Sequence, residues 1–146
     1  MKPYAENRKA LHEYEILEKF EGGLVLLGQE VKSIRNGGAK LQGAYVKLNR
    51  GELWLMGAHV SPYAKASRLV SYDPLRDRKV LITKREMNSL FGKDQQKGLT
   101  LVALSLYPRG RHIKLSFGLA RGRKAHDKRE KIKQRDLDRE IRRMER

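Results

Sequence analysis

The strongest constraint on the fold is a run of alternating side chains from His112 to Leu119. In this run, apolar residues at positions 113, 115, 117 and 119 alternate with polar residues or glycine. This period of two predicts a strand that buries one face. The segment before it, Leu99 to Tyr107, is almost entirely apolar, and Pro108-Arg109-Gly110-Arg111 has the composition of a turn. We therefore expect an antiparallel hairpin between the two segments.

Two further hairpins are expected earlier in the chain. Tyr14–Glu21 would pair with Leu24–Leu27 across Gly22-Gly23, because a glycine pair between apolar runs is a turn signal. Ala44–Leu48 would pair with Glu52–Val60 across the three residues between them, which include an Asn and a Gly. The sequence thus predicts a largely antiparallel sheet.

Two short helices are expected between the strands. Thr83 and Glu86 have the spacing of a capping box. The helix that follows is predicted to have an apolar face and a glycine stop, formed by Met87, Leu90, Phe91 and Gly92. The other helix is expected over residues 30–35, with Val31 and Ile34 facing the core.

The number of strands predicts the architecture. About six short antiparallel strands in 120 residues would leave costly open edges unless the sheet closes on itself. We therefore expect a mainly β fold, a small closed antiparallel β-barrel with short α-helices. Residues 1–120 would form this body, and residues 121–146 a basic C-terminal tail.

The charge of the chain predicts a polyanionic partner. Lys and Arg number 33 against 17 Asp and Glu, which gives a formal net charge of +16. A nucleic acid fits best, because each phosphate contact releases condensed counterions. A membrane fits less well, since no stretch approaches the roughly 18 apolar residues of a span and the start has no signal-peptide core. We expect a cytoplasmic protein.

Catalytic and metal-binding patterns are scarce in the sequence. The absence of Cys excludes disulfides and thiolate zinc sites. None of the four histidines has metal-ligand spacing; they are His12, His59, His112 and His126. No phosphate-binding loop, dinucleotide fingerprint or serine nucleophile motif occurs. We therefore expect a binding protein without catalytic residues, metal or cofactor.

The last 26 residues have a composition of their own. They contain 12 basic and 6 acidic residues, and too few apolar ones to build a core. Leu137, Ile141 and Met144 nevertheless stand at i, i+4 and i+7, which is one narrow stripe on a helix. Two interpretations stay open: a solvated, frayed helix, or a segment that folds on RNA and packs through this stripe.

The body is expected to recognise structured RNA. Aromatic residues make up only 7% of the chain, which argues against a platform for stacking single strands. Glu21 stands out by its sign, as an acid beside Gly22-Gly23 in a basic protein. It is either an acceptor for base amino groups or ribose hydroxyls, or a solvated acid at a turn. A basic patch is expected where the last strand ends, at Arg121, Arg123, Lys124, Lys128 and Arg129.

Several strings along the chain resemble those of one known family. They are Asn7-Arg8-Lys9-Ala10 with His12-Glu13-Tyr14, Gly28-Gln29-Glu30-Val31-Lys32-Ser33-Ile34-Arg35, and Asp73-Pro74-Leu75-Arg76-Asp77-Arg78-Lys79-Val80-Leu81-Ile82. Residues 98–107, 119–124 and 127–129 agree in the same order. Together they resemble the signatures of SmpB, the SsrA-binding protein family, over nearly the whole chain.

The resemblance implies a fold and a function. The fold is an oligonucleotide-binding-type barrel with small helices and a basic tail. The body would hold the tRNA-like domain of transfer-messenger RNA, also called tmRNA or SsrA RNA. It would support the alanylation of this RNA and its delivery with elongation factor Tu to stalled ribosomes. The nascent peptide is then tagged for degradation and the ribosome rescued, a process called trans-translation. We expect a monomer that associates with alanyl-tRNA synthetase and elongation factor Tu only indirectly, through the bound RNA.

The resemblance also implies which residues act. RNA-contacting positions fall on Glu21, Leu81 and Lys114, and Lys114 also points outward in the alternating strand. His12 would face the small-subunit decoding centre. The tail would become helical in the empty mRNA channel, with its contacts at Lys131, Lys133, Arg135, Leu137, Ile141 and Met144.

Two departures and two rival functions accompany this resemblance. Gly22 stands where Ala is common and Arg123 where Lys is common, and both changes are tolerable. One rival is a ribosomal-protein-like or initiation-factor-like barrel that binds ribosomal RNA permanently. The other is a ribonuclease or RNA-modifying enzyme, for which the sequence offers no acid–base constellation or cofactor loop.

Overall fold

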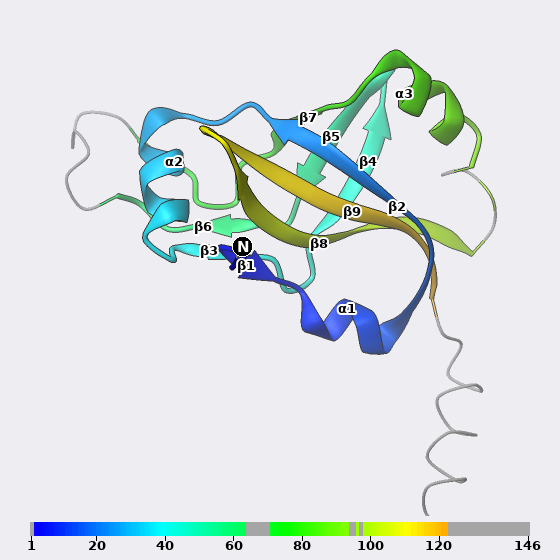
Figure 1. Ribbon diagram of the computed structural model, residues 1–146, viewed down its shortest axis with the longest axis horizontal. Coiled ribbons are helices and arrows are strands. Elements are labelled where there is room, and N and C mark those ends of the chain that lie inside the picture. The colour runs from blue at the N-terminus through cyan, green and yellow to red at the C-terminus, as the bar shows by residue number, and fades with distance from the viewer. Residues whose placement is uncertain (1, 64–70, 94–95, 97, 123–146) are drawn as a thin grey trace, which may run out of the picture.

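The computed structural model describes residues 2–63, 71–93, 96 and 98–122, and in them the chain is mainly β. Figure 1 shows the order of the elements along the chain. They are β1 (Ala5–Glu6), α1 (Arg8–Glu13), β2 (Tyr14–Leu24), α2 (Gly28–Arg35), β3 (Ala39–Lys40), β4 (Tyr45–Asn49), β5 (Glu52–Met56), β6 (His59–Val60), β7 (Arg78–Leu81), α3 (Lys84–Leu90), β8 (Leu99–Arg109) and β9 (His112–Gly122).

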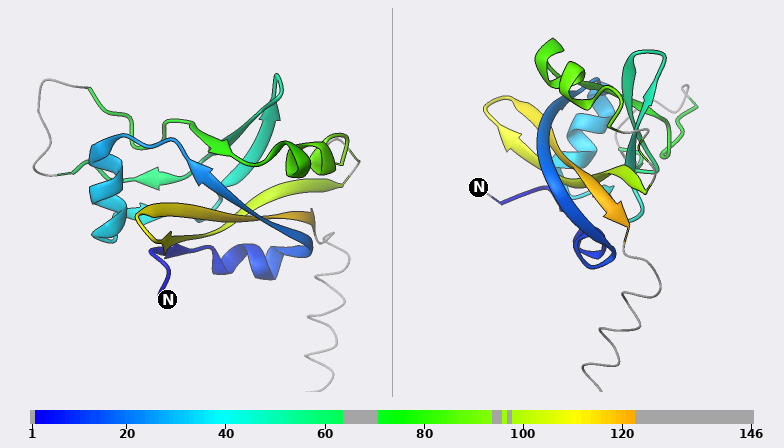
Figure 2. Two further views of the ribbon diagram at one scale, coloured as in Figure 1. Left: turned by 45° about the horizontal axis from the view of Figure 1, so that its top comes forward. Right: turned by 90° about the vertical axis from the view of Figure 1, so that its right-hand side faces the viewer.

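Six strands form a ring. The main sheet has the order β1-β8-β4-β5-β7-β2-β9, and β8 also pairs with β9, so the sheet returns to itself. Every pairing in it is antiparallel. Helices α2 and α3 lie at opposite ends of the ring (Figures 1 and 2), and each sends a fully buried residue, Ile34 and Leu90, into the central core.

The predicted hairpin of the last two strands is confirmed. Strands β8 and β9 pair along their whole length, from Arg109 opposite His112 to Leu99 opposite Arg121. The alternating apolar side chains of β9 are buried as expected, and the ring of Phe117 stacks on Phe20 of β2 with 5.5 Å between centroids. The strand runs on to Gly122, beyond the predicted end at Leu119, because β2 and β8 continue to pair with it there.

The predicted hairpin across Gly22-Gly23 is wrong. Strand β2 runs through both glycines and pairs with β9 up to Gly23 and with β7 from Gly23 onward. A Cβ atom at Gly22 would lie 2.7 Å from Cγ1 of Val80. Gly22 therefore permits a close approach of β7, as glycines within strands often do, and does not form a turn.

The other sequence-based elements are largely confirmed. Strands β4 and β5 pair with Asn49 opposite Glu52, but the expected strand 52–60 is divided at Gly57, which has φ 75°. Its last two residues form β6, which pairs with β3 in a separate small sheet. In α3 the Thr83 hydroxyl accepts from the Glu86 N–H as predicted. Phe91 is not part of the buried face, since 71% of its surface is exposed.

Helix α1 was not predicted from the sequence. Its first turn is capped by Asn7, whose side-chain oxygen accepts from the Ala10 N–H at 3.3 Å. Ala10 packs on the outer face of the sheet against Val102, Leu104 and Ala120. Leu104 reaches this outer cluster because it lies two residues from Val102 on the same face, and the bulge between Ala103 and Ser105 returns Leu106 to the inner core.

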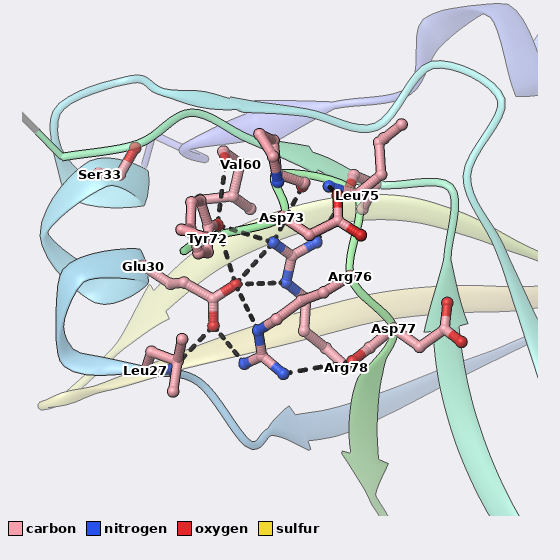
Figure 3. A network of polar contacts seen from close by, with 12 residues as sticks. Leu27, Glu30, Ser33, Val60, Tyr72, Asp73, Leu75, Arg76, Asp77 and Arg78 are labelled. Carbon is pink, nitrogen blue, oxygen red and sulfur yellow. Dashed lines mark hydrogen bonds and ion pairs between the residues drawn. The ribbon is translucent and has the colours of Figure 1, made fainter. Parts of the chain in front are cut away.

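A buried ion-pair network ties α2 to β7 (Figure 3). Glu30 and Arg78 both have 0% exposure, and the Arg78 Nε donates to Oε2 of Glu30 at 2.6 Å. Arg76 donates to both carboxylate oxygens, and the Leu27 N–H donates to Oε1 at 2.8 Å. Tyr72 joins through contacts with Glu30 and Arg78. Two segments that carry the family resemblance, 28–35 and 73–82, are thereby joined.

Candidate nucleic-acid interface

A row of four residues crosses the outer face of four neighbouring strands. Tyr107 of β8 lies opposite Lys114 of β9, Lys114 opposite Gly23 of β2, and Gly23 opposite Leu81 of β7. Because Gly23 has no side chain, the row is open at its centre. A Cβ atom there would lie 3.7 Å from the Lys114 Nζ and 3.8 Å from the Leu81 Cβ. The row thus places a cation and an apolar side chain on either side of an open position.

Glu21 adds an acceptor to this row. It lies two residues from Gly23 on β2 and therefore on the same face of the sheet. Its carboxylate forms an ion pair with Arg109 at the end of β8 and lies near the Tyr107 hydroxyl. Side-chain exposure is 36% for Glu21 and 63% for Arg109, so the pair lies at the surface.

These contacts change the ionisation of Glu21 and Tyr107. The neighbouring Tyr107 hydroxyl lowers the pKa of the Glu21 carboxyl, and Arg109 and Lys114 lower it further against the opposing effect of burial. Burial, together with the Glu21 charge, raises the pKa of Tyr107 to about 12. Near neutral pH the carboxylate is therefore ionised and the phenol is protonated, so Tyr107 is a hydrogen-bond donor.

Three positions implied by the resemblance share one hollow. Glu21, Leu81 and Lys114 line a concavity of about 500 Å³, together with Ile82, Thr83, Glu86 and Arg109. Leu81 presents 50% of its surface. A second hollow of about 350 Å³ also includes Leu81 and Lys114 and extends towards His112. An acceptor, a cation and an apolar surface thus meet at one place, which matches the mixed polar and stacking chemistry of nucleotides.

The sequence placed Glu21 wrongly but Lys114 correctly. Glu21 does not flank a turn, because it lies within β2 opposite Ser116. Lys114 lies on the outer side of the alternating strand, as its position predicted, and is half-buried. Tyr107 and Arg109 were missed. The predicted turn at residues 108–111 would have placed Tyr107 opposite His112, whereas the strands continue to Arg109 and His112 and place Tyr107 opposite Lys114.

Other predicted site residues lie elsewhere. His12 is exposed on α1, before the start of β2, whereas Glu21 lies seven residues after Tyr14, about 23 Å along the strand. Arg121 is exposed near that same end, opposite Glu15. The remaining predicted positions lie outside the described residues: Arg123, Lys124, Lys128, Arg129, Lys131, Lys133, Arg135, Leu137, Ile141 and Met144.

A larger hollow lies beside α1. It has a volume of about 820 Å³ and its lining includes Lys9, Lys40, Tyr45 and His59. The Nδ1 of His59 is buried and has no hydrogen-bond partner among the described residues. This hollow does not include Glu21, Leu81 or Lys114, so it is separate from the candidate interface.

Metal sites and membrane-spanning helices are both lacking in the part of the chain that the structure describes. Residues 2–63, 71–93, 96 and 98–122 contain no group of three or more His, Cys, Asp or Glu side chains that could hold a metal ion. Over the same part of the chain, no helix has both the length and the apolar character needed to cross a membrane.

Comparison with known proteins identifies the family. The family model described as SmpB protein matches residues 4–146. This chain belongs to the SmpB family. The match covers the strands of the ring and the basic segment after them, so SmpB is the family of the whole chain.

Individual SmpB relatives agree with this assignment. The SsrA-binding protein of Thermosynechococcus vestitus is 52% identical over 143 residues, covering 98% of this chain and 94% of the relative. That of Azotobacter vinelandii is 55% identical over 139 residues, covering 95% and 87%. A solved structure described as "tmRNA-SmpB: a journey to the center of the bacterial ribosome" matches with a TM-score of 0.68 and 48% identity, covering 82% of this chain and 84% of that one.

Proposed function

We propose that this protein binds the tRNA-like domain of transfer-messenger RNA and takes this RNA into stalled ribosomes for trans-translation. The observation that carries the proposal is the shared hollow of Glu21, Leu81 and Lys114, built from three strands in a member of the SmpB family. Its relatives are SsrA-binding proteins, and the solved match is a tmRNA–SmpB structure of the bacterial ribosome. The proposed role is that of an RNA-binding cofactor, not of an enzyme.

The chemistry of the hollow suits structured RNA. Lys114 can bind a phosphate, and the exposed Leu81 can support a base or sugar face. An ionised Glu21 accepts from base N–H groups or ribose hydroxyls and repels phosphate oxygens. These three groups together favour a defined orientation of the RNA, which a purely cationic surface would not impose.

We infer that the ring is a closed barrel of the oligonucleotide-binding type and that residues 1–120 form an RNA-binding body. Support comes from the pairing of β8 with β9, which joins the two ends of the six-strand sheet. Residues 121–146 are proposed to form the tail, with β9 extending to Gly122 at its start. Arg121, Arg123, Lys124, Lys128 and Arg129 are proposed to contact the RNA.

The tail is proposed to act in the ribosome. His12 would face the decoding centre, and the tail would become helical in the empty mRNA channel, where phosphates neutralise its cations. The proposed contacts are Lys131, Lys133, Arg135, Leu137, Ile141 and Met144. We further propose that the protein acts in the cytoplasm as a monomer and meets elongation factor Tu and alanyl-tRNA synthetase through the bound RNA.

The RNA site is tested by binding of the purified protein to transfer-messenger RNA and to an ordinary tRNA at matched salt. Glu21→Ala and Lys114→Ala should each weaken binding to transfer-messenger RNA by about 1 to 3 kcal/mol without lowering the melting temperature. Lys47→Ala, an exposed lysine of β4, is the matched control. Wild-type affinity in both site variants would remove them from the interface. Recovery of ribosomal RNA alone in a pull-down would favour the rival ribosomal role.

The tail is tested separately, in a reconstituted stalled-ribosome tagging assay. Deletion of residues 131–146, which lie beyond the proposed RNA contacts, should leave RNA binding largely intact and abolish tagging. Replacing Ile141 and Met144 together with Asp keeps the cations of the tail but removes its apolar stripe, so tagging should fall more than binding. Replacing both with Leu keeps the stripe and is the control. Wild-type tagging by the Asp variant would leave the stripe as a solvated helix face.

A further inference from the structure

Two residues that lie beside Glu21 have no role in the function proposed so far. Tyr107 and Arg109 are both on β8, two residues apart and therefore on one face. Tyr107 is directly opposite Lys114, Arg109 donates a hydrogen bond to the Glu21 carboxylate, and the Tyr107 hydroxyl lies near enough to this carboxylate to lower its pKa. Glu21 and Arg109 line the 500 Å³ hollow with Lys114, and Tyr107 lies beside them, opposite Lys114 on the neighbouring strand.

The contacts restrict a side chain that would otherwise be mobile. A surface glutamate has three rotatable side-chain bonds and loses entropy when it is ordered by a ligand. Here Glu21 is already held by the guanidinium of Arg109, and the Tyr107 phenol beside it is a second donor within its surroundings. An ionised carboxylate has about four acceptor positions, so two donors leave acceptor capacity for a ligand. With 36% of its side chain exposed, Glu21 can use that capacity towards solvent or RNA.

Arg109 also reduces the electrostatic repulsion between the Glu21 carboxylate and the phosphates of an RNA. An unpaired carboxylate in an RNA interface repels nearby phosphates, which costs binding energy. The ion pair with Arg109 offsets this charge, so Glu21 keeps its acceptor atoms with less repulsion. Lys114, which also lines the hollow, remains available for a phosphate.

We propose that Tyr107 and Arg109 are positioning residues of the RNA site, which hold Glu21 ready to accept from an N–H or O–H group of the RNA. That group is a base amino or imino hydrogen, or a ribose 2′-hydroxyl. Arg109 acts through Glu21 and does not bind a phosphate. This inference rests on the proposed RNA-binding function and extends it to two further residues.

The first test measures affinity for the tRNA-like domain of transfer-messenger RNA as a function of salt. Tyr107→Phe and Arg109→Gln should each weaken binding by roughly five- to tenfold, about the loss of one ordinary hydrogen bond, because the contact of Glu21 with the RNA is weakened and not removed. The slope of log K against log salt should stay at the wild-type value in both. If Arg109 bound a phosphate instead, its replacement would reduce the slope by about 0.7 to 0.9, and that result would overturn the proposed role of Arg109. Tyr45→Phe and Arg50→Asn, on β4 and the turn after it, are the matched controls and should bind as wild type.

The second test asks whether the effect passes through Glu21. In a Glu21→Ala background, Tyr107→Phe and Arg109→Gln should cause less than about a twofold further loss, because the group they position is gone. Full additive losses would show that they act on the RNA or the fold directly, and would overturn the inference. In the free protein, the ultraviolet titration of Tyr107 should move from a pKa of about 12 towards 10.0 when Glu21 is replaced. An unchanged titration would show that the pair does not form.

The outcomes separate this inference from the proposed function. If the wild-type protein fails to distinguish transfer-messenger RNA from ordinary tRNA, the proposed function is wrong. If it distinguishes them and Glu21→Ala weakens binding while Tyr107→Phe and Arg109→Gln bind as wild type, only the positioning role is wrong. Thermal melting of each variant identifies reductions in affinity that come from unfolding.

Discussion

Replacement of Glu30 by Gln should strongly destabilise the fold, although the two side chains have nearly the same shape. Glu30 accepts five hydrogen bonds: from the Leu27 N–H, from two nitrogens of Arg76, from the Arg78 Nε and from the Tyr72 hydroxyl. A Gln amide would turn one acceptor into a donor that faces other donors. It would also leave the guanidinium of Arg78, which has 0% exposure, buried without a counter-charge.

The expected loss follows from the burial of the pair. Removal of one partner of a buried, hydrogen-bonded ion pair costs about 3 to 5 kcal/mol. For a chain of this size, 1 kcal/mol corresponds to roughly 4 °C in melting temperature, so Glu30→Gln should lower it by roughly 12 to 20 °C. Thermal unfolding followed by circular dichroism at neutral pH measures this. The control is Glu52→Gln, whose partner Lys79 is 39% exposed and whose loss should cost less than about 1 kcal/mol.

The pH dependence of the same variant gives an independent check. Burial opposes ionisation of Glu30, but the hydrogen bonds from Arg76, Leu27 and Arg78 outweigh it and hold its pKa below the ordinary 4.5. A depressed pKa adds stability above pH 4.5, and this contribution is lost as the pH falls through the folded-state pKa. The stability difference between wild type and Glu30→Gln should therefore shrink below pH 4.5. Equal melting temperatures at neutral pH, or a difference that grows in acid, would refute the role of the network.

Two further predictions concern packing and charge. Gly22→Ala should lower the free energy of unfolding in urea by about 1 to 3 kcal/mol, because its Cβ would lie 2.7 Å from Cγ1 of Val80. Gly23→Ala is the control and should be close to neutral, since the nearest atom to its Cβ would be 3.7 Å away. Equal effects of the two variants would contradict the close approach of β7. Affinity for the tRNA-like domain should fall steeply with salt concentration, because the chain carries a net charge of +16. Each phosphate contact should add about 0.7 to 0.9 to the magnitude of the slope of log K against log salt. A flat salt response would show that phosphates are not the main contacts.

The sequence predicted the parts of the fold that depend on local pattern. The β8–β9 hairpin was found because one strand alternates strictly and a turn precedes it. The Gly22-Gly23 pair was misjudged because a glycine serves equally as a turn residue or as a place where another strand approaches. Strand β7 was missed because it begins with Arg78, a residue that is rarely buried.

In the candidate site, too, local patterns predicted single residues but not the contacts that depend on strand pairing. Alternation alone placed Lys114 on the outer face, the acidic charge of Glu21 in a basic chain marked it as a candidate, and only Leu81 depended entirely on the family resemblance. The partners of Glu21 could not be read from its neighbours in sequence, because Arg109 lies 88 residues away and meets it only through the pairing of β2 and β8 with β9. The buried pair of Glu30 and Arg78, 48 residues apart, was hidden for the same reason.

Strand β9 fixes the distance between the hollow at Lys114 and the start of the basic segment at Gly122. It passes Lys114 at the hollow and ends at Gly122, where the basic segment begins, eight residues or about 26 Å later. Hydrogen bonds to β2 and β8 on both sides keep it from stretching. An insertion of one residue between these points would lengthen the interval by only about 3 Å, yet it would turn every later side chain to the opposite face. Strand β9 therefore tolerates substitutions on its outer face but not insertions between Lys114 and Gly122. The turn at Gly110 lies outside this interval, so added residues there would not change the distance between the hollow and the basic segment.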